Sequence, residues 1–371
     1  MSFDEVVDRS GSDSSRWGGR GDVLALTIGD SDFQLPPAVE AAIRARMTGI
    51  LGYDTVPDRL TAAISERLNR LYRWQVDPDW FFYLPGVIQG LNFSCRALTQ
   101  DHESVVTEVP VYYPFLDAPL NAGRKRHDLP AIRGTNGWQF DFDGFEKLAA
   151  DANCRLLMLC HPHNPLGRIL DRGSLERIAE ICTRHDVLIC SDEIHADILF
   201  DGDVHVPMGM IAPERTVMLT SPSKAFAMSG LGGAFAIIPN IEIREKFESW
   251  ALGLVPNISV LTLAAMQAAY SECEEWLSTE VAYLKDNRDY LFSRFSKCSK
   301  LKVHLPEATY FLWLDFRETG WNDPYQKILD HGVELTEGAK FNGPGYLRLN
   351  FASPRSVLVQ AADRIERALT A

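Results

Sequence analysis

Residues 187–198 read VLICSDEIHADI, an apolar run rich in β-forming residues that ends in acidic and polar side chains. Two other segments have the same form: residues 156–167 read LLMLCHPHNPLG, and residues 216–226 read TVMLTSPSKAF. Continuous apolar runs of this length predict strands that are buried on both faces. Because helix-like stretches separate them, the pattern is typical of an α/β protein whose mostly parallel sheet is covered by helices.

The alternation extends along much of the chain. Strands are expected at residues 80–84, 104–109, 155–160, 187–190 and 216–220, with helices at 87–98 and 175–185. After Pro256 the pattern changes to long helices over 259–270 and 275–295, strands at 308–315 and 346–351, and a last amphipathic helix. The first 35 or so residues lack periodicity and are expected to form an arm packed on the rest. We therefore expect an N-terminal arm and small-domain segment over 1–45, a large domain over 46–255 and a small α+β domain over 256–371.

Composition excludes several classes of protein. Of the 371 residues, 50 are acidic and 37 basic, and a net charge of -13 opposes binding to nucleic acid or anionic membranes. The longest nearly unbroken apolar stretch, residues 231–238, is far shorter than a membrane helix. An acidic, polar N-terminus differs from a secretory signal and favours a cytoplasmic protein. The seven cysteines include no C-x-x-C pair, so we expect reduced thiols and no structural zinc.

Polar side chains follow the predicted strands at the points where ligands bind in open parallel sheets. They are Asn164, Asp192, His195, Ser221, Ser223 and Lys224. Each also has a structural interpretation, because an Asn-Pro pair forms turns, an aspartate caps helices and a lysine is usually solvated. Their combination in this order predicts one crevice that holds an amide, a carboxylate, hydroxyls and an amine.

In these segments the chain resembles the fold-type I pyridoxal 5'-phosphate (PLP) enzymes of the class I/II aminotransferase superfamily. The matching motifs are N-P-x-G at 164–167, D-E-I-H at 192–195, S-x-S-K at 221–224 and R-L-N at 348–350. Within the superfamily it is most similar to the MalY/PatB-like cystathionine β-lyase (C–S lyase) group. The similarity lies in FDEVVDR (3–9), GYDTVPDRL (52–60), VYYPF (111–115), CHPHNPLGR (160–168), SDEIHADI (191–198), SPSKAF (221–226), EEWL (274–277) and ATYFLWLD (308–315).

The resemblance implies roles around the PLP ring. Lys224 is expected to form the Schiff base with PLP and then to take the Cα proton of the substrate. Asp192 is expected to pair with the pyridine nitrogen, and Asn164 to bind the phenolic oxygen, with His195 near the same edge. Tyr112 is expected to stack on the ring, although Tyr113 is adjacent in sequence. Lys224, Asp192 and Tyr112 are thus the expected catalytic residues.

Other residues are expected to hold the phosphate and the substrate. Gly86, Val87 and Ile88 open a predicted helix, whose free N–H groups suit a phosphate, and Ser221 and Ser223 are expected to assist them.

Arg348 is expected to bind the substrate carboxylate, with Asn164 and Tyr112 beside it. Tyr53 resembles a residue that reaches the phosphate of a neighbouring subunit, which implies a homodimer with shared active sites.

The expected reaction is β-elimination from an L-cysteine thioether, which yields a thiol, pyruvate and ammonia. No arginine occurs between Lys224 and Arg244, as in the lyase group. Residues 26–33 (LTIGDSDF) and 223–227 (SKAFA) depart from the lyase pattern. These departures keep open a bulkier S-conjugate, and they keep open transamination or the decarboxylating or oxidative deamination of such a conjugate.

Three other classes fit the sequence less well. A nicotinamide dehydrogenase needs a glycine motif after an early strand, and Gly18, Gly19 and Gly21 follow none. A metal site at Cys160, His161 and His163 lacks a fourth ligand at a recognised spacing. A non-catalytic regulator would normally carry an additional DNA-binding domain.

Overall fold

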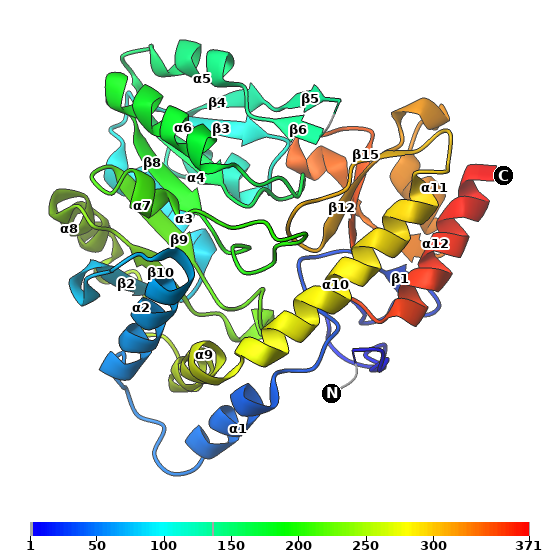
Figure 1. Cartoon of the computed structure of the whole chain (residues 1–371), viewed down its shortest axis with the longest axis horizontal. Helices are drawn as coiled ribbons and strands as arrows, with labels where there is room; N and C mark the ends of the chain where they lie inside the picture. The colour runs from blue at the N-terminus through cyan, green and yellow to red at the C-terminus, as the bar shows by residue number, and fades with distance from the viewer. Residues whose placement is uncertain (1–2, 136, 371) are drawn as a thin grey trace.

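A computed structural model describes residues 3–135 and 137–370; residues 1–2, 136 and 371 lie outside this description (Figure 1). Its main sheet has seven strands in the order β2-β10-β9-β8-β7-β3-β4. Their bounds are β2 Phe81–Leu84, β3 Ser104–Val109, β4 Lys125–Pro130, β7 Cys154–Cys160, β8 Leu188–Asp192, β9 Thr216–Thr220 and β10 Ala234–Ile237. Strands β9, β8, β7, β3 and β4 pair in parallel, whereas β10 pairs antiparallel with both β9 and β2. All strands of this sheet except β10 therefore present their carboxyl ends at the same edge.

The main sheet is buried on both faces, as its apolar runs predict. In β7, Leu156 and Met158 belong to one apolar cluster, while Leu157 and Leu159 belong to another on the opposite face. Successive side chains of a strand point to opposite faces, so an unbroken apolar run serves two helical layers. The layers are α3 (Val87–Leu98), α4 (Pro114–Asn121) and α8 (Ile241–Ala251) on one face, and α5 (Phe142–Ala149), α6 (Arg172–Arg184) and α7 (Met208–Ile211) on the other. The predicted α/β class is confirmed.

The C-terminal part carries a second, antiparallel sheet. Its strands lie in the order β11 (Lys302–Val303), β12 (Phe311–Asp315), β15 (Tyr346–Asn350) and β14 (Thr336–Glu337). The accompanying helices are α9 (Val260–Glu272), α10 (Glu274–Phe295), α11 (Pro324–Leu329) and α12 (Arg355–Thr370). In Figure 1, α10 runs diagonally from α9 to the end of the molecule that holds β12 and β15.

The N-terminal segment joins this C-terminal part. Strand β1 (Leu24–Ala25) pairs in parallel with β13 (Val333–Glu334). Helices α1 (Pro37–Arg46) and α2 (Asp58–Tyr72) pack against α9. Elsewhere, β5 (Ile132–Gly134) and β6 (Gly137–Gln139) form a small antiparallel hairpin. The pairing of β1 with β13 supports our proposal that residues 1–45 include a small-domain segment, while the boundaries at 45 and 255 stay predictions.

Two general features bear on the environment of the protein. Within the described residues, no helix combines the length and apolar character that crossing a membrane requires. All seven cysteines are free thiols; six are buried, and Cys298 is half-buried. Cys160 and Cys190 lie in β7 and β8, within the apolar runs that predicted these strands.

Candidate active site

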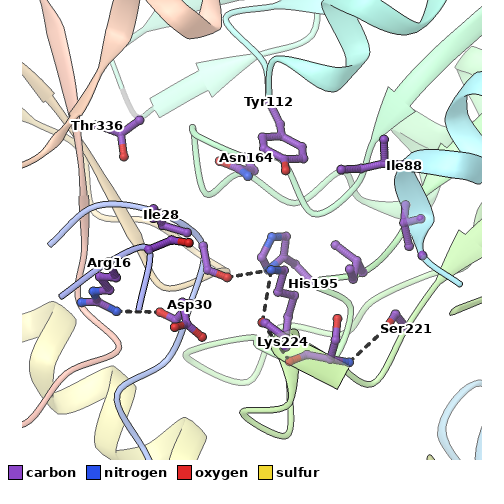
Figure 2. A pocket seen from close by; sticks show the side chains of 18 of the residues that line it. Arg16, Ile28, Asp30, Ile88, Tyr112, Asn164, His195, Ser221, Lys224 and Thr336 are labelled. Carbon is purple, nitrogen blue, oxygen red and sulfur yellow. Dashed lines mark hydrogen bonds between the residues drawn. The ribbon is translucent and has the colours of Figure 1, made fainter. Parts of the chain in front are cut away.

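A cavity of about 1210 Å³ opens at the carboxyl-end edge of the main sheet (Figure 2). Five successive connections contribute to its wall, because β2, β3, β7, β8 and β9 all end at this edge. The predicted residues that line the cavity are Gly86, Val87, Ile88, Tyr112, Asn164, Asp192, His195, Ser221, Ser223, Lys224 and Arg348. The structure therefore brings together every predicted site residue except Tyr53.

Lys224 places its amine inside the cavity. Its Nζ donates hydrogen bonds to the carbonyl oxygen of Gly29 at 2.6 Å and to Ser229 Oγ at 3.3 Å. Burial lowers the pKa of Lys224 to about 8, and the positive charge of Arg348 acts in the same direction, while Asp30 and Asp192 oppose the shift. An amine in this environment loses its proton more readily than a solvated lysine, as a nucleophile or a base must.

Asp192 ends β8 with its side chain buried at the cavity floor. Its Oδ1 accepts a hydrogen bond from the backbone N–H of Ile194 at 3.0 Å. Burial raises the pKa of Asp192 to about 7, and the neighbouring Glu193 adds to the shift. A buried carboxyl of this kind is stabilised as an anion by a cation placed against it. The protonated nitrogen of a pyridine ring fits that requirement.

Glu193 follows Asp192 in sequence, but its side chain has a structural role. Its carboxylate accepts hydrogen bonds from Ser191 Oγ and the Met208 backbone N–H, and it lies 2.6 Å from His205 Nε2. All of these groups are buried away from the cavity lining. Only one of the two adjacent acidic residues is therefore available to a ligand.

Arg348 is a buried cation with no acidic partner. Its Nη1 donates to Asn164 Oδ1 at 2.9 Å, and its guanidinium lies 4.0 Å from the Phe311 ring centre and 4.8 Å from that of Phe341. Among the described residues, no carboxylate lies within ion-pair distance of it, and its buried Nε has no hydrogen-bond partner. An unpaired buried charge is costly, so this guanidinium is poised for a carboxylate ligand.

His195 and Tyr112 lie on opposite sides of the cavity centre in Figure 2. His195 is buried, its Nδ1 has no hydrogen-bond partner, and burial together with Lys224 and Arg348 holds its pKa well below the ordinary value. These surroundings disfavour the positively charged form of His195. Tyr112 and Tyr113 both line the cavity, but Tyr113 is 43% exposed, whereas Tyr112 is half-buried. The lower exposure of Tyr112 favours it as the residue that stacks on a bound ring.

The start of α3 forms the end of the cavity suited to a phosphate. Gly86 precedes the helix in an extended conformation, and the first N–H groups of an α-helix lack intrahelical acceptors. Ser221 Oγ donates to the Gly233 carbonyl at 2.6 Å and accepts from the Ser223 N–H at 3.1 Å. Ser221 thus shapes the loop, and the Ser223 hydroxyl is the freer donor. Together, the amine, the buried carboxylate and this cradle fit PLP.

Tyr53 lies outside this cavity. It is 96% exposed in the loop between α1 and α2. Its neighbours Ile50 and Leu51 are also exposed. The position leaves Tyr53 free to contact another molecule.

Part of the cavity wall was not predicted from the sequence. These residues include Arg9, Ser12, Ser14, Ser15, Arg16, Thr27, Ile28, Gly29, Asp30, Cys160, Phe311, Thr336 and Lys340. The N-terminal arm was expected only to pack on the rest, yet it borders the cavity. The departure of residues 26–33 from the lyase pattern was the one sequence signal that pointed to this region.

The histidines next to Cys160 have structural partners. His161 packs on His205 with ring centres 4.6 Å apart, and His163 Nε2 lies 3.3 Å from Glu108 Oε2. Glu108 in turn binds both terminal nitrogens of Arg168. In the part of the chain that the structure describes, no group of three or more His, Cys, Asp or Glu side chains is arranged to hold a metal ion.

Comparison with known proteins agrees with this geometry. Residues 21–365 match the family described as aminotransferase class I and II. The chain is 31% identical to cystathionine beta-lyase PatB of Bacillus subtilis, over the full length of both proteins. It superposes on the crystal structure of OvoB with a TM-score of 0.97 and 36% identity, covering all of both chains. It also superposes on the PLP-bound C-S lyase of Staphylococcus hominis with a TM-score of 0.94 and 28% identity, covering 100% of this chain and 98% of the other. With these matches spanning nearly its whole length, the chain belongs to the class I and II aminotransferase family.

Proposed function

We propose that the protein is a PLP-dependent C–S β-lyase that cleaves an L-cysteine thioether to a thiol, pyruvate and ammonia. The observation that carries the proposal is the unpaired, buried guanidinium of Arg348 in the same cavity as Lys224 and Asp192. A carboxylate-bearing amino acid satisfies this guanidinium, and the lysine supplies the amine that PLP chemistry requires. The names of the PatB and Staphylococcus hominis relatives support elimination at sulfur.

The cofactor is held by groups from separate connections. Lys224 would carry it covalently, Asp192 would face its ring nitrogen, and the N–H groups at the start of α3 would bind its phosphate. Asn164 and His195 would border its phenolic edge, and Tyr112 would lie against one face of its ring. When bound, PLP supplies an electron sink for the negative charge that forms when a substrate loses its Cα proton.

The residues of the chain handle the substrate and its proton. Arg348 and Asn164 orient the α-carboxylate, and this fixes the Cα–H bond relative to Lys224. Lys224 Nζ then takes the Cα proton. The Cβ–S bond breaks with its electron pair going to sulfur, which leaves as a thiol after taking up a proton. Water hydrolyses the remaining three-carbon product to pyruvate and ammonia.

No observation favours a second function to the same degree. Aminotransferases also belong to this family. The absence of arginine between Lys224 and Arg244 and the names of the lyase relatives favour elimination. Decarboxylating or oxidative deamination differs in its products, so it is separated from elimination by experiment.

The test is the product spectrum without a keto acid. PLP-loaded protein is incubated with cystathionine and with a bulky S-alkyl cysteine, and thiol, pyruvate, carbon dioxide and peroxide are assayed. We expect thiol and pyruvate in equal amounts. A strict requirement for a keto acid would identify an aminotransferase, and release of carbon dioxide or peroxide would identify the other branches.

We further propose a homodimer with shared active sites. Tyr53 stands on an exposed loop with Ile50, and a second apolar segment holds the exposed Leu252 and Leu254. Exposed apolar side chains grouped in this way are typical of subunit interfaces. Tyr53 would then reach the cavity of the partner subunit.

A cytoplasmic location is also part of the proposal. It is supported by the seven free cysteines, since thiols persist in a reducing compartment.

A further inference from the structure

Ser229 lines the cavity, and the function proposed above does not use it. It begins the 3-10 turn η2 (Ser229–Leu231), five residues after Lys224. Its Oγ lies 3.3 Å from Lys224 Nζ, and the same amine donates to the Gly29 carbonyl at 2.6 Å. The amine, which lies in the cavity near His195 in Figure 2, therefore rests between one hydroxyl and one carbonyl.

The hydroxyl proton of Ser229 is directed away from this amine. Ser229 Oγ donates to the Ser223 carbonyl at 3.4 Å, and the Met228 N–H donates to the same carbonyl at 3.1 Å. A serine hydroxyl has one proton and two acceptor lone pairs. Because the proton goes to Ser223, the lone pairs of the Ser229 oxygen remain for the amine of Lys224.

The backbone between these residues is strained. Ala227 has a φ of +52°, in the left-handed region that a residue with a Cβ rarely adopts. The turn at Ala227 brings Ser229 back toward Ser223 and Lys224. Costly backbone conformations of this kind cluster at active sites, where they fix side chains in place. Ala227 also belongs to the segment 223–227 that departs from the lyase pattern.

The titratable groups that surround the amine act on it through their charge. They are Asp30 of the N-terminal arm, Asp192 in β8, His195 just after it, Tyr310 next to β12, and Arg348 in β15. Burial and the cation of Arg348 oppose the ammonium form, whereas Asp30 and Asp192 favour it. Among the described residues, none forms an ion pair with Lys224, and its amine donates to Gly29 and Ser229. Substitution of Ser229 therefore changes a direct contact and leaves the surrounding charges in place.

We propose that Ser229 is a positioning residue, which holds the amine of Lys224 for transfer of the substrate Cα proton. In this step the Cα–H bond breaks, the proton goes to Lys224 Nζ, and the electron pair stays with the substrate. Ser229 Oγ and the Gly29 carbonyl then accept two of the three N–H bonds of the ammonium. Acceptors favour the charged form, so they stabilise the product of the transfer. The proposal rests on the role of Lys224 in the function proposed above, and it does not depend on which bond breaks afterwards.

The first test measures the amine in the absence of substrate. In Ser229→Ala the ammonium loses one acceptor, so the pKa of Lys224 should fall and the neutral amine should form at lower pH. We expect the pH at which apoprotein incorporates PLP at half its maximal rate to fall by about 0.5 to 1 unit. Ser229→Thr keeps the hydroxyl and should keep the wild-type midpoint. An unchanged midpoint in Ser229→Ala would overturn the proposal.

The second test measures proton transfer in PLP-loaded protein. L-Alanine has no leaving group at Cβ, so exchange of its Cα proton with solvent deuterium reports this step alone. We expect exchange to slow about three- to tenfold in Ser229→Ala and to recover in Ser229→Thr. Ser293→Ala is the control, because Ser293 is exposed and its hydroxyl also donates to a backbone carbonyl. Wild-type exchange in Ser229→Ala, or equal losses in Ser229→Ala and Ser229→Thr, would refute the positioning role.

The two tests distinguish failure of this proposal from failure of the lyase function. If wild-type protein forms no pyruvate from a thioether but exchanges the L-alanine proton, the lyase function fails and both tests of Ser229 still apply. If it does neither, the midpoint in apoprotein decides alone. A lower midpoint in Ser229→Ala then supports the contact between Ser229 and the amine, and an unchanged midpoint refutes it.

Discussion

The amine of Lys224 titrates in surroundings that oppose its charge. Since burial lowers the pKa of Lys224 to about 8, the neutral amine predominates above that pH instead of above 10.5, the usual value. We expect the rate at which apoprotein incorporates PLP to rise with pH and to level off above about 8. The measurement is the absorbance of the lysine-linked cofactor after mixing. Borohydride should fix the label on Lys224, and Lys224→Ala should show none; a rate still rising steeply to pH 10 would contradict the expectation.

Asp192 offers a second prediction for a single residue. Asp192→Asn keeps the shape of the side chain but removes the negative charge that would hold a proton on the pyridine nitrogen. We expect the loss of the Cα proton to slow by at least about a hundredfold, which corresponds to about 3 kcal/mol of barrier. Exchange of the substrate Cα proton with solvent deuterium measures this step directly. Exchange at a near-native rate would show that another group controls the ring nitrogen.

For single residues, the sequence predicts those whose chemical role is indicated by a motif. Lys224, Asp192 and Arg348 could be identified because each follows or lies in a strand and matches a motif. The contact between Thr27 and Thr336 could not, since the residues are 309 positions apart and threonine carries no distinctive signal. The same limit applies to Gly29, which meets Lys224 only through its backbone carbonyl.

Among the elements, the N-terminal arm is held by polar contacts. Arg16 is 1% exposed and donates to the carbonyls of Ala25 and Asp30 and to Ser353 Oγ. It also pairs with Asp32 at 3.1 Å. Such a network leaves no apolar periodicity in the sequence, which explains why the arm was not assigned to the cavity wall.

Removal of Arg16 should therefore loosen the arm. Arg16→Ala removes a buried cation that binds two backbone carbonyls and leaves the half-buried Asp32 without this partner, and we expect a loss of about 3 kcal/mol of folding stability. Urea unfolding measures the loss, and KM should rise because the arm borders the cavity. Arg44→Ala removes an exposed pair with Glu40 and is the control, with an expected change below about 0.5 kcal/mol. Equal effects of the two substitutions would contradict the anchoring role.

The strands and helices differ in how clearly the sequence predicts them. The predicted strands 104–109 and 216–220 coincide with β3 and β9, and the predicted helix 87–98 coincides with α3, because buried runs and helical periodicity are unambiguous there. Strand β4 was not predicted, since only Leu129 of its KRHDLP sequence is buried at the sheet edge. Strand β10 lies within the apolar stretch 231–238, but its antiparallel pairing depends on neighbours distant in sequence.

For the whole molecule, the proposed dimer makes a quantitative prediction. Tyr53→Ala and Lys224→Ala should each be inactive alone, for different reasons. In a mixed dimer, one site loses both side chains and the other keeps both. After subunit exchange in an equal mixture, we expect recovery of up to about a quarter of wild-type activity. Size-exclusion chromatography with light scattering establishes the dimer. Complete exchange without recovery would refute the shared site.

The cavity joins the two ends of the chain, and this has a consequence for biosynthesis. Its wall includes Arg9 and Asp30 from the N-terminal arm, and Thr336 and Arg348 from the antiparallel sheet of the C-terminal part. A nascent chain that has emerged only as far as β10 already holds Asp192 and Lys224 but not Arg348. Translation must pass β15 before the carboxylate site exists. Ribosome-bound fragments that end before Arg348 would consequently be unable to anchor an amino acid.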